Sequence, residues 1–230
     1  MPPKPFISVV VPCWGDDALL QDRAWDWCDM PHVAEVIIVT ASDATDLKSV
    51  GNVRVLTADR PNRGRQMNLG AEAANGDILL FHHADSDLTP DHVESIASSL
   101  SESEKVGGAF HRAFDERHPA FAWISHFERW RNQHHGSLFG DQSIFVRTEH
   151  FRKLGGFREY PLMEDMEFSQ RLRKSGRIIL LDPPMRSSAR RHLQRGAWRT
   201  SLQNVLFIVL YHAGVSPVTL HRWYYSLKTS

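Results

Sequence analysis

The sequence predicts an α/β domain with an open, mostly parallel sheet flanked by helices. Short apolar, β-branched runs at 6–11, 35–39, 53–56 and 78–81 are typical of strands. Segments with helical composition at 16–30 and 63–74 lie between these runs. Since strands that alternate with helices form parallel sheets, we expect a single sheet with the helices packed on its faces.

The second half of the chain continues this alternation. Thr89 before Pro90, and Thr148, are expected helix N-caps, and Gly155, Gly156 and Gly176 are expected helix stops. We therefore expect strands at 106–114, 144–146 and 178–181, and helices at 90–100, 119–135, 148–154, 164–175 and 196–211.

Composition narrows the class of protein. The 230 residues with 42% hydrophobic side chains are sufficient for one sizeable domain. Lys plus Arg equals Asp plus Glu at 27 each, so no overall charge favours a nucleic-acid partner. Cys13 and Cys28 are too few for a disulfide framework, which indicates a reducing, cytoplasmic location. We find no signal-peptide pattern and no run of 18 apolar residues, so we expect neither export nor a membrane span.

The stretch 77–87, D-I-L-L-F-H-H-A-D-S-D, is the strongest candidate for a site. Its apolar run is typical of a strand buried on both faces, and Asp85 and Asp87 follow that strand. Alternate residues of an extended segment point the same way, and ligands bind at the carboxyl ends of strands in open α/β sheets. Two carboxylates there favour Mg²⁺ or Mn²⁺ completed by substrate phosphates. The alternative is an Asp-Ser-Asp turn that caps the next helix.

Two further pairs carry charge at expected helix starts. Glu164 and Asp165 favour the helix dipole, or they form a catalytic pair in which one carboxylate raises the pKa of the other. Arg63 and Arg65 begin the helix before the central strand, where they either contact phosphate or are solvated.

The tail 196–211 is apolar on nearly all sides at its end. Four arginines lie beside it: Arg190, Arg191, Arg195 and Arg199. We expect it to pack on the domain, to bind a second copy of the chain, or to contact a membrane surface.

The order of these motifs resembles the inverting family 2 glycosyltransferases of the GT-A fold over residues 6–176. The resemblance rests on I-S-V-V-V-P, N-R-G-R-Q-M-N-L-G-A, N-G-D-I-L-L-F, H-A-D-S-D, G-D-Q-S-I-F-V-R, L-G-G-F and M-E-D-M-E-F-S-Q-R-L. Two of these motifs, R-G-R-Q-M-N and G-D-Q-S-I-F-V-R, are similar to a short bacterial branch of the family.

The resemblance implies a single GT-A domain with three regions: a nucleotide-sugar half at 1–88, an acceptor half at 89–195 and a helical tail at 196–230. It implies transfer of a sugar, with inversion, from a UDP- or GDP-linked donor to the hydroxyl of an acceptor. The identity of the acceptor is left open, and a lipid-linked one is among the candidates. Mn²⁺ or Mg²⁺ would be held by Asp85 and Asp87, with Asp87 as the direct ligand and Asp85 nearer the ribose or a metal-bound water. Asp165 would be the general base, with Glu164 and Asp141 as the alternatives, and Glu164 would otherwise orient sugar or acceptor.

The resemblance also implies secondary contacts. These are Pro12, Asp16, Arg63 and Arg65 for the nucleotide, Asp141 and Gln142 for acceptor or donor sugar, and His192 as a further metal ligand. Thr40 follows the second strand, where the family usually has an acidic residue that contacts the base. Trp14 would stack on the base or fill space.

Other classes fit parts of the pattern. A sugar-phosphate nucleotidyltransferase shares the sheet and the acidic metal site. It needs a glycine-rich basic loop after its first strand, whereas the loop at 13–16 in this sequence is acidic. A non-catalytic sugar-nucleotide or carbohydrate-binding protein would tolerate loss of both acidic pairs. A glycoside hydrolase uses two carboxylates without a D-x-D metal motif.

Overall fold

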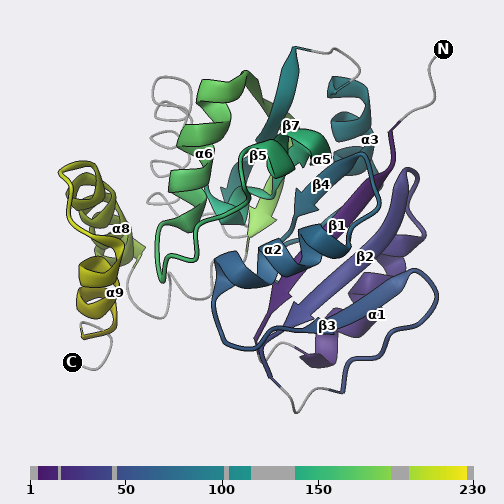
Figure 1. Cartoon of the computed structure of the whole chain (residues 1–230), viewed down its shortest axis with the longest axis horizontal. Coiled ribbons are helices and arrows are strands. Elements are labelled where there is room, and N and C mark those ends of the chain that lie inside the picture. Colours follow the sequence, from purple (N-terminus) through teal and green to yellow (C-terminus); the bar gives the residue numbers. More distant parts are fainter. Residues whose placement is uncertain are drawn as a thin grey trace.

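The expected α/β architecture is confirmed in the computed structural model of the chain (Figure 1). The structure describes residues 5–14, 17–42, 46–100, 104–114, 138–187 and 197–226. Seven strands form one sheet in the order β3-β2-β1-β4-β6-β5-β7. The strands are β1 Ile7–Cys13, β2 Val33–Thr40, β3 Val53–Thr57, β4 Ile78–Phe81, β5 Lys105–Phe114, β6 Ile144–Arg147 and β7 Arg177–Ser187.

The helices lie between strands and at the C-terminal end. They are α1 Asp17–Cys28, α2 Arg63–Ala73, α3 Pro90–Ser99, α5 Thr148–Lys153, α6 Glu164–Ser175, α8 Ala197–His212 and α9 Pro217–Ser226, with a 3₁₀ turn η1 at Gly140–Gln142. None of the helices in the described ranges is long and apolar enough to cross a bilayer.

The sheet is parallel except at β6. Strand β6 runs antiparallel to β4 and β5, and in its register Ile144 pairs with Phe81. The first residue of β6 therefore lies beside the last residue of β4. This reversal, which the sequence did not predict, brings η1 to the carboxyl end of β4, where the acidic motif follows.

The two faces of the sheet bury two separate layers. Side chains of α1 and α3 pack with Val9 of β1 on one face, and side chains of α2, α5 and α6 pack with Val10 on the other. The alternation of Val9 and Val10 follows from the two-residue period of a strand. Phe157, from L-G-G-F, packs in the second layer with its ring centroid 4.4 Å from that of Phe168 and 4.8 Å from that of Phe81.

Two local predictions were wrong. The first strand, expected to end at residue 11, continues through Pro12 to Cys13, with Pro12 paired to Val39. Strand β4 pairs with β1 only as far as Val10, so the missing N–H of Pro12 leaves no bond unmade on that side. Thr148 is the first residue of α5 rather than its N-cap, and its hydroxyl donates to the Gly76 carbonyl at 2.6 Å.

The tail folds as a helical hairpin rather than one helix. Helices α8 and α9 lie beside α6, at the opposite end of the molecule from β2 and β3 (Figure 1). Phe207 and Leu220 are buried, and the ring of Phe207 meets that of Tyr224 at 5.7 Å between centroids. The sequence predicted the first helix of this pair but not α9.

Several predicted features lie outside the described residues. They are Asp16, the helix at 119–135, His192, and Arg190, Arg191 and Arg195 of the basic segment before α8. The predictions made for them stay as sequence-based expectations.

Gly70 sets how closely α2 approaches β1. A Cβ at this position would lie 2.4 Å from Val10 Cγ1, which is too close for contact. We predict that Gly70→Ala lowers the free energy of unfolding by about 1–3 kcal/mol through overpacking, despite the gain in helix propensity. Urea denaturation measures it, with Glu72→Ala on the exposed side of α2 as the control. Equal stability of Gly70→Ala and the native protein would contradict this packing.

Candidate active site

The acidic motif forms a turn directly after β4. The side chains of Asp85 and Asp87 are 48% and 63% exposed, so both carboxylates are open to a ligand. His83 Nδ1 lies 2.6 Å from Asp85 Oδ1. Arg23 of α1 donates to the Ala84 carbonyl at 2.8 Å and approaches Asp87 Oδ1 at 3.8 Å. The expected pair of carboxylates therefore lies at the carboxyl end of the central strand.

The buried side chain of His82 fixes the conformation of this turn through two hydrogen bonds. Its Nε2 lies 3.1 Å from the Ser86 carbonyl, which accepts only, so Nε2 carries the proton and Nδ1 accepts from the Ser143 hydroxyl at 2.8 Å. Burial lowers the pKa of His82 to about 3, so the imidazole is neutral in this role. The side chain thus joins the acidic turn to the residue that follows η1.

Glu164 and Asp165 begin α6, as predicted. Met163 precedes them with φ 69°, a left-handed conformation that is costly for a residue other than glycine. Asp165 accepts from the backbone N–H of Gly140 and of Met166, both at 2.7 Å. Burial, and then the charge of Glu164, raise the pKa of Asp165 to about 6, against the opposing effect of Arg63. This carboxylate is poised to gain or lose a proton near neutral pH.

Arg63 of α2 lies between the two carboxylates. Its Nη1 donates to Glu164 Oε1 at 3.1 Å and lies 3.9 Å from Asp165 Oδ2. Burial opposes the charge on Arg63, but Glu164, Asp165 and Asp141 outweigh it and raise the pKa of the guanidinium. Gly140 leaves room for this group, since a Cβ there would meet Arg63 Nη2 at 2.0 Å.

A continuous set of contacts joins the two acidic pairs. The Asp85–Asp87 turn rests on His82, His82 bonds to Ser143, and Ser143 N–H bonds to Gly140 O at 3.3 Å within the turn around η1. Gly140 in turn donates to Asp165. Both pairs are therefore built around η1, at one end of the sheet.

The two residues after Gly140 are engaged within the chain. Asp141 forms an ion pair with Arg112 of β5 and keeps a side chain that is 35% exposed. Gln142 is buried, donates to the Phe110 carbonyl at 3.2 Å and accepts from the N–H of Phe139 at 3.0 Å. Gln142 shapes η1 with both ends of its amide. Contacts of either residue with acceptor or donor sugar stay a prediction.

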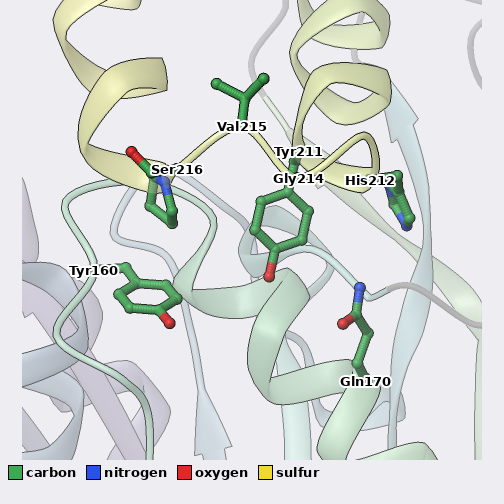
Figure 2. Close-up of a pocket in the computed structure, with 8 residues that line it drawn as sticks. Tyr160, Gln170, Tyr211, His212, Gly214, Val215 and Ser216 are labelled. Carbon is green, nitrogen blue, oxygen red and sulfur yellow. The ribbon is translucent and has the colours of Figure 1, made fainter.

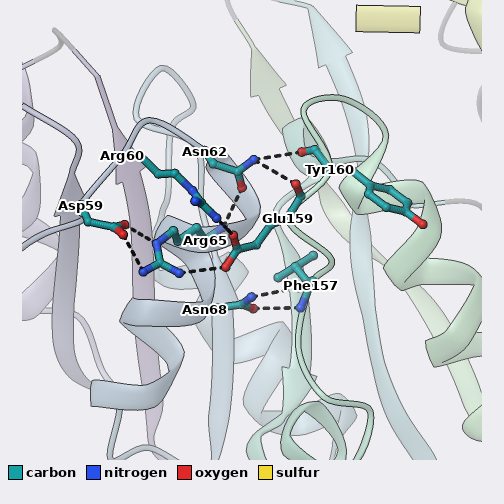
Figure 3. A network of polar contacts seen from close by, with 8 residues as sticks. All are labelled: Asp59, Arg60, Asn62, Arg65, Asn68, Phe157, Glu159 and Tyr160. Carbon is teal, nitrogen blue, oxygen red and sulfur yellow. Dashed lines mark hydrogen bonds and ion pairs between the residues drawn. The ribbon is translucent and has the colours of Figure 1, made fainter. Parts of the chain in front are cut away.

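Arg65 also pairs with carboxylates of the chain, as Figure 3 shows. It donates to Asp59 Oδ2 at 2.9 Å and to Glu159 Oε1 at 3.0 Å. These two bonds raise the pKa of the Arg65 guanidinium. Arg63 and Arg65 are thus each paired with carboxylates of the chain. The nucleotide contacts expected for Arg63, Arg65 and Pro12 stay a prediction.

Other residues of the motif N-R-G-R-Q-M-N bind neighbouring segments to α2 by hydrogen bonds and close packing. Asn68 exchanges two bonds of 2.8 Å with the backbone of Phe157 (Figure 3). Gln66 is buried and donates to the Cys13 and Val39 carbonyls at 2.8 and 2.7 Å. A Cβ on Gly64 would lie 2.6 Å from the Arg158 carbonyl. One helix thereby fixes the ends of β1 and β2 and the loop that leads to Glu164.

The acidic turn fits a divalent cation shared with a substrate. In the described ranges no three His, Cys, Asp or Glu side chains are grouped to hold a metal ion. Mg²⁺ and Mn²⁺ need fewer protein ligands where substrate phosphates and water complete the shell. Two exposed carboxylates on one turn match that requirement, and the chain would contribute Asp85 and Asp87.

A cavity of about 340 Å³ lies between α6 and the C-terminal hairpin. Figure 2 shows Tyr160, Gln170 and Tyr211 around it, with Ser216 from the turn between the helices. Burial, and then the charges of Glu167, Tyr160 and Asp165, raise the pKa of Tyr211. The cavity therefore lies within the electrostatic influence of the Asp165 carboxylate.

Three contributors to the site were missed in the sequence. They are His82, Ser143 and Arg23. One of the two adjacent histidines in H-H-A-D, a serine before a strand and an arginine on an irregular helix have no spacing in the sequence that pairs them. Only the reversal of β6 and the packing of α1 bring them to the acidic turn.

The chain belongs to the family described as Glycosyl transferase family 2, whose profile matches residues 8–155. This span runs from the second residue of β1 past the end of α5, and it includes the acidic turn and η1. The sequence matches none of the curated proteins with which it was compared.

Solved structures confirm the GT-A fold. The mannosyltransferase PcManGT from Pyrobaculum calidifontis, in complex with GDP-Man and Mn²⁺, superposes with a TM-score of 0.66 at 15% identity, over 94% of this chain and 67% of that one. TarS 1-349 of S. aureus gives 0.60 at 13% identity, over 94% and 68%. TarS in complex with UDP-GlcNAc gives 0.60 at 14% identity, over 80% and 58%.

The raised pKa of Asp165 makes stability depend on pH. The folded protein binds this proton up to about pH 6, whereas the unfolded chain loses it near 4, so the free energy of unfolding falls as pH rises through this window. We predict that Asp165→Asn removes about 1–3 kcal/mol of the difference in unfolding free energy between pH 4 and pH 7. Urea denaturation at both values measures it, with the exposed Glu72→Gln as control. An identical pH dependence in native protein and Asp165→Asn would contradict the assignment.

Proposed function

We propose that this protein is a metal-dependent, inverting glycosyltransferase that moves a sugar from a nucleotide-sugar donor to an acceptor hydroxyl. The observation that carries the proposal is the position of Asp165, whose pKa is raised to about 6: it begins α6 and accepts from Gly140 of η1, the turn that is joined to the acidic motif through Ser143 and His82. Direct displacement needs a base on one side of the sugar and a stabilised diphosphate leaving group on the other. The two carboxylate pairs supply groups for both.

The donor binds at the carboxyl ends of β1, β2 and β4. Asp85 and Asp87 would hold Mn²⁺ or Mg²⁺, a Lewis acid that offsets the negative charge growing on the leaving diphosphate. Trp14, which follows β1, is 64% exposed and so presents a ring face on which a nucleobase can stack. A UDP- or GDP-linked donor is supported by relatives of the same fold whose complexes contain GDP-Man or UDP-GlcNAc.

Asp165 takes the proton from the attacking acceptor hydroxyl. With a pKa about 6 it is mostly ionised at pH 7 and still basic enough to accept a proton in the transition state. The bonds from Gly140 and Met166 fix its orientation. Glu164 is held by Arg63 and lies on the same first turn, where it orients sugar or acceptor.

The acceptor enters from the side of the C-terminal hairpin. The cavity between α6 and the hairpin offers the rings of Tyr160 and Tyr211, the amide of Gln170 and the hydroxyl of Ser216. Aromatic faces with a few neutral polar groups suit a hydroxyl-rich ring. The carboxylates that raise the pKa of Tyr211 disfavour an anion in the cavity. The reaction takes place in the cytoplasm, where nucleotide-sugars are made.

We expect Asp165→Asn to lower turnover by about two to four orders of magnitude, because it removes the general base. Donor binding should persist, since the donor lies at the other carboxylate pair. Transfer from a panel of UDP- and GDP-sugars to methyl glycosides, followed by mass spectrometry, measures turnover. Glu149→Gln, which changes an exposed carboxylate of α5 outside both the donor and the acceptor regions, is the control. Near-native turnover of Asp165→Asn would move the role of base to Glu164 or Asp141.

Asp87→Ala should abolish Mn²⁺-dependent binding of UDP and GDP while the protein stays folded. The substitution removes an exposed oxygen ligand and no core volume. Calorimetry with and without Mn²⁺ measures the binding, and Asp91→Ala, on the exposed first turn of α3, is the matched control. Unchanged Mn²⁺-dependent binding in folded Asp87→Ala would show that the metal lies elsewhere.

A further inference from the structure

The outer face of the C-terminal hairpin is apolar and exposed. On α8, Trp198, Leu202, Leu206 and Val209 are 50%, 64%, 54% and 58% exposed. Their spacing of four, four and three residues places them along one side of the helix. On α9, Val218, Trp223 and Tyr225 are 46–51% exposed. Of the eleven large hydrophobic side chains exposed in the described residues, seven belong to this hairpin.

The same part of the chain carries only positive charge. Residues 183–230 contain seven Lys or Arg and no Asp or Glu, while the whole chain is neutral with 27 of each sign. The remainder therefore carries a negative excess of seven. Arg199 and Arg222 are exposed, and each is adjacent in the sequence to an exposed tryptophan, Trp198 and Trp223.

The exposed apolar side chains and the positive charge together favour one kind of binding partner for the hairpin face. A second copy of the chain, docked hairpin to hairpin, would bring two positive regions together without an acidic partner, which is costly. An anionic bilayer surface offers the opposite charge and takes up apolar side chains at the headgroup boundary. Tryptophan and tyrosine are the side chains that favour that boundary.

We propose that the α8–α9 hairpin is a membrane-binding surface that docks the protein on anionic lipid headgroups, with α8 lying in the plane of the interface. Arg199 and Arg222 contact lipid phosphates. The exposed apolar side chains of α8 enter the headgroup region; they are Trp198, Leu202, Leu206 and Val209. This surface does not depend on the proposed reaction, because neither acidic pair belongs to it.

Vesicle co-sedimentation of the chain of residues 1–230 tests the proposal. The probes are vesicles of phosphatidylglycerol and phosphatidylcholine at 3:7, and vesicles of phosphatidylcholine alone. We expect binding to the anionic vesicles that weakens at least tenfold between about 0.05 and 0.5 M NaCl, because salt screens the arginines. Equal binding to both vesicles, or none to either, would overturn the proposal.

Two variants separate the apolar and charged contributions. Leu202→Ser with Leu206→Ser should weaken vesicle binding at least about tenfold by removing buried apolar area. Val50→Ser, with a similar exposure of 51% far from the hairpin, should leave binding unchanged. Arg199→Gln with Arg222→Gln changes only exposed side chains and should weaken binding by roughly 10- to 30-fold, since each basic residue contributes roughly fivefold at an anionic surface.

Light scattering on the same samples tests the rival occupant. A native dimer that becomes a monomer in Leu202→Ser with Leu206→Ser, with no vesicle binding by either protein, would show that a second copy covers this face. A native monomer that binds anionic vesicles supports the lipid surface. If the leucine variant does not fold, the arginine variant decides the question, and unchanged vesicle binding by it would contradict the proposal.

Discussion

The ion pair between Arg63 and the Glu164–Asp165 pair is the interaction on which the candidate active site depends. Two neighbouring carboxylates that are largely removed from water repel each other, and burial raises the pKa of Asp165. The guanidinium of Arg63 lies between the two carboxylates, with Nη1 3.1 Å from Glu164 Oε1 and 3.9 Å from Asp165 Oδ2. Its positive charge offsets their repulsion. Gly140 is required at η1 because a side chain there would overlap the guanidinium.

Helix α2 brings this arginine to its place and also connects the remaining parts of the site. Gln66 ties α2 to the ends of β1 and β2, where the donor is proposed to bind, and Asn68 ties it to the loop before α6. A shift of α2 would therefore move Arg63, the donor side and the base together. The stability of the second core layer and the geometry of the reaction are linked through one helix.

The sequence predicted the alternation of elements, the end of the central strand and the start of α6 because each has a local signal: a period, a cap or an apolar run. It also placed Asp85, Asp87, Glu164 and Asp165 at the ends of elements, where the structure has them. The direction of β6 has no local signal, since a run of three apolar residues has the same pattern in both directions. Two contacts depend on this direction, that of His82 with Ser143 and that of Gly140 with Asp165, so the sequence could not predict them. It also could not predict that Arg63 pairs with Glu164 and Asp165.

The pKa of Asp165 tests the central claim most directly. Carbon-detected NMR titration of the side-chain carboxyls can follow this residue in the native protein and in Arg63→Met, with Asp165→Asn to assign the signal. The account predicts a pKa about 6 in the native protein, and a higher value in Arg63→Met, because the variant loses the charge that opposes burial. A native value near 4, or one that does not rise in Arg63→Met, would contradict it.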